Sequence, residues 1–286
     1  MNSPATKNDH QRALFALLCE FDRVCRRLDI PYVLFAGTLL GAVRHGGFIP
    51  WDDDLDVLMF RSDYERFLAE APGVIDSDKF FLQKEFSAHW PMFFSKLRLN
   101  NTTCLEKFHP RDEQQHQGIY MDIFPCDPAA KGSLCRRTQF LASKVVIAKA
   151  LYARGYETES RTKKLFMTLC RLLPGGLFAG LAKHGSADSG YVHSFFAAAK
   201  SYGKNVFPEA WLARRDALSF EGQRFPVPAD YDAMLKLLYG DYMQLPPEED
   251  RAVKAHAILV DAERSYEAYA GYRDGMEFEV KTKSIR

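Results

Sequence analysis

The chain has 286 residues, 47% of them hydrophobic, and its 38 Lys and Arg nearly balance 37 Asp and Glu. This length and apolar content can fill one large core or two modest ones, which argues against extensive disorder. A net charge of +1 gives no reason to expect nucleic acid or an anionic membrane as the main partner of the whole chain.

The cysteines and the N-terminal residues indicate in which cellular compartment the protein is expected. Six cysteines are spread through the chain without a C-x-x-C pair, which favours reduced thiols over a disulfide framework. The first residues lack the uninterrupted apolar run of a secretory signal. We therefore expect a cytoplasmic protein.

The first half of the chain alternates helical and extended patterns. Residues 10–29 predict an amphipathic helix that ends before Pro31. "YVLFA" predicts a short buried strand, and "GTLLGAVRHGG" a turn into a helix that stops at a glycine pair. "DLDVLMF" predicts the next strand, before a helix from Ser62. Further strands are predicted at 79–85, 93–99 and 119–125, with a polar loop at 107–118.

From about residue 131 the pattern becomes helical, with long runs at 132–154 and 161–173. An extended piece, "LSFEGQRFPVP", and a helix in "ADYDAMLKLLYG" follow. We predict an α+β fold. Its mixed β-sheet flanked by helices would form a catalytic core at 1–130, and a mainly helical part at 131–286 would pack on that core.

The apolar stretch "LFMTLCRLLPGGLFAGLAKHG" covers residues 165–185 and is interrupted by Arg171 and by the Pro174 turn. Two core helices joined by a turn are the favoured interpretation. A peripheral contact with a membrane, centred on 165–181, is the alternative that stays open.

The stretch "WDDDLDV" carries four carboxylates directly before an apolar run. Because side chains alternate along a strand, Asp54 and Asp56 should share one face, joined by Asp52 if the strand extends back that far. Asp53 should point the other way, into solvent. Carboxylates crowded beside a core repel one another, so the pattern calls for a cation such as Mg²⁺ or Mn²⁺.

Other interpretations of this cluster compete. An EF-hand would need glycine where Val57 stands and Glu where Asp63 stands. The D-x-D metal site of sugar-nucleotide glycosyltransferases has the same carboxylate spacing and remains a competitor. A solvated acidic loop is the ordinary explanation of a charge run, but here the apolar neighbours draw the aspartates toward the core.

Residues outside the cluster point to phosphate chemistry. Gly37 and Thr38 lie between a predicted strand and helix, where backbone N–H groups can approach a phosphate. Asp122, in "YMDIFP", is a polar residue within an apolar strand and a candidate third acid, with a turn cap near Pro125 as the alternative. Together they form a nucleotidyltransferase arrangement. Cations that could meet donor phosphates are Arg44, His45, Lys84, Lys96 and Arg98.

Each of these cations has an ordinary structural explanation as well. His45 could instead satisfy carbonyls at a helix C-terminus. For Lys84, Lys96 and Arg98, an exposed charge on a strand explains the sequence equally well.

Several longer motifs carry a family resemblance. The chain resembles the LicD family in "GTLLGAVRHGGFIPWDDDLDV", "YMDIFP", "FEGQRFPVPADYD" and "YGDYMQLPPEED", over about residues 28–256. The family comprises bacterial phosphocholine transferases with fukutin and fukutin-related protein as animal relatives. The resemblance implies a nucleotidyltransferase-like fold, with a mixed β-sheet flanked by helices. It also implies transfer of a phosphorylated small alcohol from a CDP-activated donor, such as CDP-choline, to a sugar hydroxyl of a cell-surface glycan or glycolipid, as in lipopolysaccharide or teichoic acid biosynthesis. Such acceptors are built on lipid carriers, which implies work at the inner face of the membrane.

Carried over residue by residue, the resemblance assigns roles within the quoted motifs. Gly37 and Thr38 match the residues at the donor phosphates. Asp54 and Asp56 match the family's metal-binding pair. Asp122 matches its third acid, and Asp52 matches an acid with an accessory role.

The expected activity is therefore Mg²⁺-dependent phosphotransfer with release of CMP. Asp122 would be either the ligand of a second ion or the base for the acceptor hydroxyl. Nucleotidyl transfer from an NTP with release of pyrophosphate is one alternative, and a non-catalytic nucleotide-binding scaffold is another. Nucleic acid is not expected as a partner.

Overall fold

The computed structural model describes residues 7–106, 114–195, 201–251 and 257–272. The helices are α1 (Lys7–Leu28), α2 (Ala36–His45), α3 (Arg61–Glu70), α4 (Ser133–Arg154), α5 (Arg161–Cys170), α6 (Gly175–Lys183), α7 (Ala210–Ala213), α8 (Tyr231–Tyr239) and α9 (Glu248–Arg251). The strands are β1 (Val33–Leu34), β2 (Asp56–Phe60), β3 (Phe80–Gln83), β4 (Ser95–Leu99), β5 (Thr103–Glu106), β6 (Tyr120–Pro128), β7 (Tyr191–His193), β8 (Val206–Pro208), β9 (Arg215–Phe220), β10 (Gln223–Pro228) and β11 (Ala257–Asp261).

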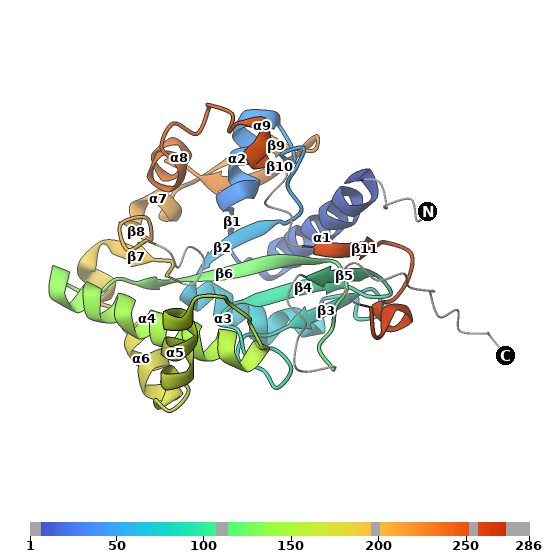
Figure 1. Cartoon of the computed structure of the whole chain (residues 1–286). Coiled ribbons are helices and arrows are strands. Elements are labelled where there is room, and N and C mark those ends of the chain that lie inside the picture. The colour runs from blue at the N-terminus through green and yellow to red at the C-terminus, as the bar shows by residue number, and fades with distance from the viewer. Residues whose placement is uncertain (1–6, 107–113, 196–200, 252–256, 273–286) are drawn as a thin grey trace.

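One mixed sheet forms the centre of the molecule, with strand order β1-β2-β6-β4-β3 (Figure 1). Strands β2 and β6 run parallel, and the neighbouring pairs are antiparallel. The far end of β6 continues beyond β2 and β4 to pair with β7, which in turn pairs with β8. Strands β9 and β10 form a hairpin, and β5 pairs with β11.

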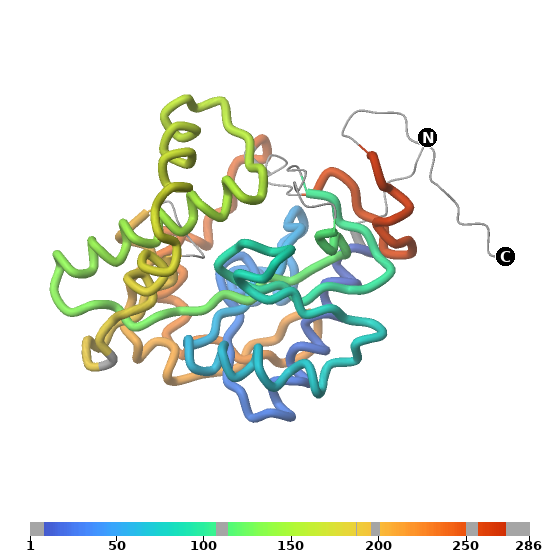
Figure 2. The backbone as a smooth tube through the Cα atoms, turned by 90° about the horizontal axis from the view of Figure 1, so that it is seen from below, coloured from blue at the N-terminus to red at the C-terminus, as the bar shows by residue number. Residues whose placement is uncertain are grey.

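Helices α1 and α3 cover one face of this sheet, while α4 and α5 lie on the other side (Figure 2). On the first face, the Tyr64 hydroxyl of α3 hydrogen-bonds the Ser95 hydroxyl of β4 at 2.6 Å. Because side chains alternate along a strand, Lys96 of β4 points to the opposite face. The face that carries Lys96 is the one on which the predicted acids gather.

The β9–β10 hairpin holds the end of α2. Its turn residues Glu221 and Gly222 have φ values of 51° and 79°, as a tight hairpin turn requires. The Glu221 carboxylate accepts a hydrogen bond of 2.9 Å from the backbone N–H of Phe48. The hairpin therefore fixes the chain that leads from α2 into the acidic stretch.

The predicted α+β fold class and most predicted elements are confirmed. One boundary is wrong in a way that matters, because β2 begins at Asp56 and residues 52–54 lie in the preceding loop. Strands β5, β7, β8 and β11 are additions, so the chain after residue 130 contributes strands as well as helices. Part of the predicted polar loop, residues 107–113, lies outside the described residues. The division at residue 130 stays a prediction.

The apolar stretch at 165–185 forms α5 and α6, which meet at an angle of 101°. Their apolar side chains are mostly exposed, with Leu172 at 74%, so the interpretation of this stretch as core helices is wrong for most of it. Within the described residues, no single helix is long and apolar enough to cross a membrane. The bent pair α5 and α6, taken together, has the necessary length and apolar composition.

Candidate active site

Two predicted acids and one predicted cation lie in a row across the sheet. Asp56 of β2 is directly opposite Asp122 of parallel strand β6, and Asp122 is directly opposite Lys96 of β4. Residues that face each other on paired strands point to the same side of the sheet. The Lys96 ammonium lies 2.9 Å from the Asp122 carboxylate. The sheet thus brings together side chains that are far apart in sequence.

Burial and mutual repulsion raise the pKa of the two strand acids. Asp56 is 9% exposed, and its pKa is raised well above the ordinary value by burial and then by the negative charges of Asp54, Asp122 and Asp52. Burial also raises the pKa of Asp122, against the opposing effect of Lys96. At Asp56 the repulsion from the neighbouring carboxylates therefore exceeds the opposing effect of the Lys96 ammonium.

Asp52 and Asp54 reach the site because the loop folds onto the first turn of α2. A Cβ atom on Gly37 would lie 2.8 Å from Asp52 Oδ2 and 3.9 Å from Asp54 Oδ1. These two acids therefore meet Gly37 through a loop conformation and not through strand alternation. A side chain at position 37 would push the Asp52 carboxylate away from this place.

Asp53 is not simply solvated, contrary to the prediction. Its carboxylate accepts a hydrogen bond of 3.1 Å from the backbone N–H of Ala257 at the start of β11. The middle acid of the run therefore anchors the loop to a C-terminal strand. This anchor holds Asp52 and Asp54 on the side facing Gly37.

The start of α2 holds β2 in place. The Thr38 hydroxyl accepts a hydrogen bond of 2.8 Å from the backbone N–H of Asp56, and the Phe35 N–H donates to the Asp56 carbonyl at 3.0 Å. Between them Ala36 has a φ of 46°, a left-handed conformation that costs a residue with a side chain about 1–2 kcal/mol. Such backbone strain is typical of functional sites. Here the conformation of Ala36 places the first turn of α2 beside Asp52 and Asp54.

Lys96 is a buried residue of the site and not an exposed strand charge. It is 1% exposed, and its ammonium lies 3.0 Å from the centre of the Tyr120 ring and 3.8 Å from the Glu106 carboxylate. Burial lowers the pKa of Lys96, opposed by Asp122 and Glu106. These contacts fix the ammonium in one position beside the acids.

The other two strand cations do not join this row. Arg98 is buried, and it donates to Gln83 Oε1 at 2.6 Å and to the carbonyl of Gly118 at 2.8 Å, which gives it a structural role. Lys84 is exposed. It follows Gln83, the last residue of β3, and lies outside the pairing of β3 with β4.

Arg44 and His45 lie in the last turn of α2. The Arg44 guanidinium donates to the carbonyl of Tyr242 at 2.8 Å, which joins α2 to the segment after α8. His45 is exposed and packs edge-on against Trp51, with ring centres 6.2 Å apart. Partial burial and the charge of Arg44 lower the pKa of His45. In this geometry Arg44 positions a neighbouring segment.

Three further residues, Glu106, Arg154 and Tyr239, belong to the site but escaped the sequence analysis. Glu106 pairs with Lys96 and with Arg154 at the end of α4, and it accepts a hydrogen bond of 3.1 Å from the Tyr120 hydroxyl. Burial would raise the pKa of Glu106, but the cations Lys96, Arg154 and Arg98 outweigh burial and hold it at about 2. The sequence carries no signal that joins Glu106 to a helix 48 residues away.

Tyr239, the last residue of α8, is the third. Desolvation and then the charges of Asp56, Asp52 and Asp54 raise the pKa of Tyr239, which places its hydroxyl within electrostatic reach of the acids. The residue is nevertheless 43% exposed as a whole. Its position in the motif "YGDYMQLPPEED" was the available signal.

Asp52, Asp54, Asp56 and Asp122 act on one another electrostatically, and carboxylate oxygens are the ligands that Mg²⁺ prefers. Yet in the part of the chain that the structure describes, no three or more His, Cys, Asp or Glu side chains stand close enough together to hold a metal ion by themselves. A divalent cation at this site therefore stays a prediction, and it would need oxygen ligands from water or substrate beside the carboxylates.

Comparison with known proteins gives a consistent result. A family model described as LicD/FKTN/FKRP, nucleotidyltransferase domain, matches residues 29–153. The lipopolysaccharide cholinephosphotransferase LicD of Haemophilus influenzae is 30% identical over 269 residues, which cover 88% of this chain and 96% of the relative. The ribitol 5-phosphate transferase FKRP of mouse is 31% identical over 105 residues, or 35% of this chain and 21% of the relative.

Proposed function

Because the chain belongs to the LicD family, we propose that it is a phosphotransferase of the CDP-alcohol type that moves phosphocholine, or a similar phospho-alcohol, to a sugar hydroxyl of a cell-surface glycan. The relatives named above transfer different groups, a choline phosphate and a ribitol phosphate. The nature of the alcohol is therefore the open part of the proposal. A cytoplasmic location stays a prediction.

One observation carries the proposal. Asp56 and Asp122 lie side by side on parallel strands, and Asp52 and Asp54 lie against the first turn of α2 at Gly37. Carboxylates on one side and the N-terminal end of a helix on the other suit a substrate that presents phosphates together with a divalent cation.

The reaction transfers the distal phosphorus of the CDP-alcohol. A bond forms between the acceptor oxygen and this phosphorus, while the bond to the phosphate oxygen of CMP breaks and CMP leaves with the electron pair. The hydroxyl proton goes to a base. A bound Mg²⁺ or Mn²⁺ would supply positive charge to the diphosphate as the leaving group develops.

The chain's own residues have separable roles in this scheme. Asp54 and Asp56 would hold the cation, with Asp52 in support and Gly37 leaving room for these acids. The Lys96 ammonium stabilises the charged form of Asp122, which suits a ligand more than a base. The structural hydrogen bond at Thr38 keeps the start of β2, and hence Asp56, in register with Asp122.

The test compares two acids of the same run. Asp56→Asn should abolish Mg²⁺-dependent release of CMP from CDP-choline in the presence of a glycan acceptor, with a loss of at least about 100-fold. Its thermal stability should stay the same or rise, because the substitution removes a buried charge from a repelling cluster. The matched control Asp53→Asn keeps an oxygen that can accept from Ala257 and should retain turnover. Full activity in a folded Asp56→Asn variant would refute the proposal.

A second candidate is nucleotidyl transfer from an NTP, which the description of the matched domain favours. Phosphorus NMR of the products separates the two reactions, because one releases CMP and the other pyrophosphate. A thermal-shift panel of CDP-choline, CDP-ribitol, CDP-ethanolamine and CDP-glycerol would then identify the donor, since a ligand that binds the folded state raises its melting temperature. Binding of a donor without turnover would favour the non-catalytic scaffold.

A further inference from the structure

The helices after the core carry a strong positive charge that the sum over the chain conceals. Residues 131–185 contain eleven Lys and Arg and two Glu, a formal charge of +9, whereas the whole chain has +1. Between Arg161 and Gly185 there is no Asp or Glu. Three of these cations pair with acids outside the segment, Lys131 with Asp188, Arg154 with Glu106 and Lys183 with Glu85, which leaves a formal charge of +6. A local field of one sign acts on a partner over about a Debye length, roughly 10 Å, so this part of the molecule attracts anions.

The same helices expose a large apolar surface, which we call the α5–α6 face. Within α5, Met167 and Cys170 are buried near α4, and the other side chains of that helix are exposed. Figure 2 shows α5 projecting from the body of the molecule. The exposed apolar residues of the α5–α6 face are Leu165, Phe166, Leu169, Leu172, Leu173, Leu177 and Leu181.

The α5–α6 face is held rigidly on the core. The Lys149 ammonium of α4 donates to the carbonyls of Arg171 at 2.8 Å and Leu173 at 2.7 Å, which fastens the bend between α5 and α6. Lys183 at the end of α6 pairs with Glu85 of the core at 3.0 Å. The exposed leucines therefore belong to a fixed surface.

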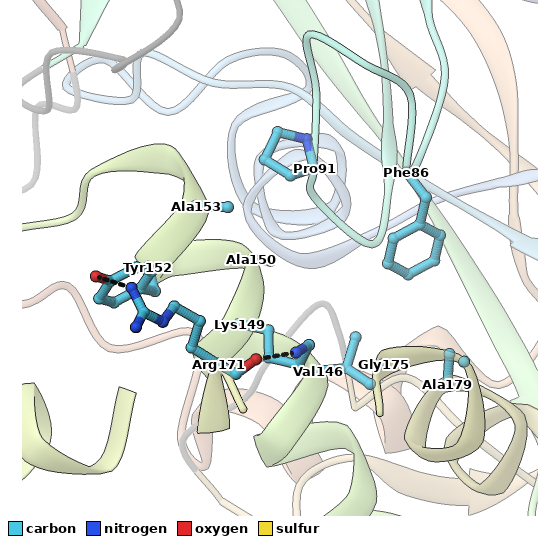
Figure 3. A pocket seen from close by; sticks show the side chains of 11 residues that line it. Phe86, Pro91, Val146, Lys149, Ala150, Tyr152, Ala153, Arg171, Gly175 and Ala179 are labelled. Atoms are coloured by element: carbon cyan, nitrogen blue, oxygen red, sulfur yellow. Dashed lines mark hydrogen bonds between the residues drawn. The ribbon is translucent and has the colours of Figure 1, made fainter. Parts of the chain in front are cut away.

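An apolar cavity of about 570 Å³ adjoins this face (Figure 3). Its walls come from α4, from the start of α6 and from Phe86 and Pro91 in the loop between β3 and β4. The Arg171 guanidinium, which also lines the cavity, donates to the Tyr152 hydroxyl at 3.1 Å. A mainly hydrocarbon lining with the two cations Lys149 and Arg171 suits a ligand that is apolar at one end and anionic at the other, as a phospholipid is.

Charge decides which partner suits the α5–α6 face. A second copy of the chain docked on the same face would bring two strongly positive surfaces together, which is unfavourable. An anionic bilayer offers negative headgroups for the exposed cations Arg161 and Lys164 and an acyl boundary for the leucines. We propose that the α5–α6 face docks this protein on the surface of an anionic lipid bilayer. This proposal does not depend on the proposed reaction.

Co-sedimentation with vesicles tests the docking without any assay of activity. The protein should bind vesicles of phosphatidylcholine with about 30 mol% phosphatidylglycerol at about 0.1 M salt, and bind vesicles of phosphatidylcholine alone much more weakly. Salt at about 0.5 M should weaken the binding because it screens the headgroup contacts. Equal binding to both kinds of vesicle, or to neither, would overturn the proposal.

Two pairs of variants locate the surface. Leu169→Glu, at a residue that is 54% exposed, should weaken binding at least about 10-fold, whereas Leu245→Glu, at 49%, should leave it unchanged. Lys164→Glu should weaken binding at least about 5-fold, and the exposed Arg27→Glu should not. Circular dichroism checks the fold of each variant, and Leu177→Ser serves as a second apolar variant.

The oligomeric state distinguishes docking on lipid from self-association. Light scattering should report the same mass for the wild-type protein and for Leu169→Glu in the absence of lipid. A wild-type dimer that Leu169→Glu dissociates would assign the α5–α6 face to a second copy and contradict the proposal. Variants that bind anionic vesicles as tightly as the wild type would contradict it as well.

Discussion

Replacement of Lys96 by methionine tests how the two strand acids are held. Methionine keeps the length and apolar stem of the side chain but removes the ammonium, which lies 2.9 Å from Asp122 and 3.8 Å from Glu106. Lys96 is 1% exposed, so water does not replace the lost charge readily. Asp122 then remains a buried carboxylate beside Asp56 without its ammonium partner.

The magnitude follows from the burial of this pair. Removal of one partner of a buried ion pair typically costs about 3–5 kcal/mol, because the other charge stays uncompensated. Glu106 keeps Arg154 as a partner, so the loss falls mainly on Asp122 and on the contact with the Tyr120 ring. We expect a loss of about 3 kcal/mol in the free energy of unfolding and a fall in melting temperature of roughly 6–10 °C.

Urea unfolding followed by circular dichroism measures this loss, with Lys84→Met as the matched control. Lys84 is an exposed lysine from the neighbouring β3 region, so its replacement should change stability by less than about 0.5 kcal/mol. The double variant Lys96→Met with Asp122→Asn should recover about 1–2 kcal/mol, since the unpaired carboxylate is gone. A Lys96→Met protein within about 1 kcal/mol of the wild type would refute this account of the site.

Three other substitutions probe separate features. Gly37→Ala should leave stability nearly unchanged but lower CMP release at least about 10-fold, because the alanine Cβ would lie 2.8 Å from Asp52 Oδ2 and displace that carboxylate. Wild-type activity of this variant would argue against the described packing of the Asp52 loop on α2. Thr38→Val should lower the free energy of unfolding by about 1–3 kcal/mol, because the buried N–H of Asp56 loses its acceptor, and Thr38→Ser should restore most of it. Burial lowers the pKa of His193 to about 4, below its unfolded value of about 6.5, so the folded state binds fewer protons between these values and loses stability as the pH falls. Between pH 7 and pH 5 the wild type should therefore lose about 2 kcal/mol more than His193→Phe in urea titrations, and parallel pH profiles would contradict this assignment.

Much of the local structure could be predicted because it depends on short-range patterns. The apolar periodicity of 10–29 and 132–154 predicted α1 and α4, and the apolar run after "WDDD" predicted β2. The chemistry of the site was also visible, since a buried strand that begins with carboxylates needs a cation or a basic partner. These inferences use only neighbours in sequence.

The arrangement of the acids could not be predicted from alternation alone. Asp52 and Asp54 lie in a loop that approaches Gly37, and Asp53 is held by a strand more than 200 residues later. Lys96 and Lys84 look alike in sequence, yet Lys96 is buried within the paired strand β4, whereas Lys84 is exposed just past the end of β3. The register of a sheet decides such cases, because a shift of one residue reverses the face of every side chain.

By itself, then, the sequence determined the fold class, the family resemblance and which residue types hold the candidate chemistry. The tertiary structure alone decided that Asp56, Asp122 and Lys96 form one row, and that Glu106 and Arg154 close the network behind Lys96. The physical reason is the same in each case. Helical and strand periodicity act between residues a few positions apart, whereas charge pairing across a sheet depends on contacts that form only when distant segments pack together.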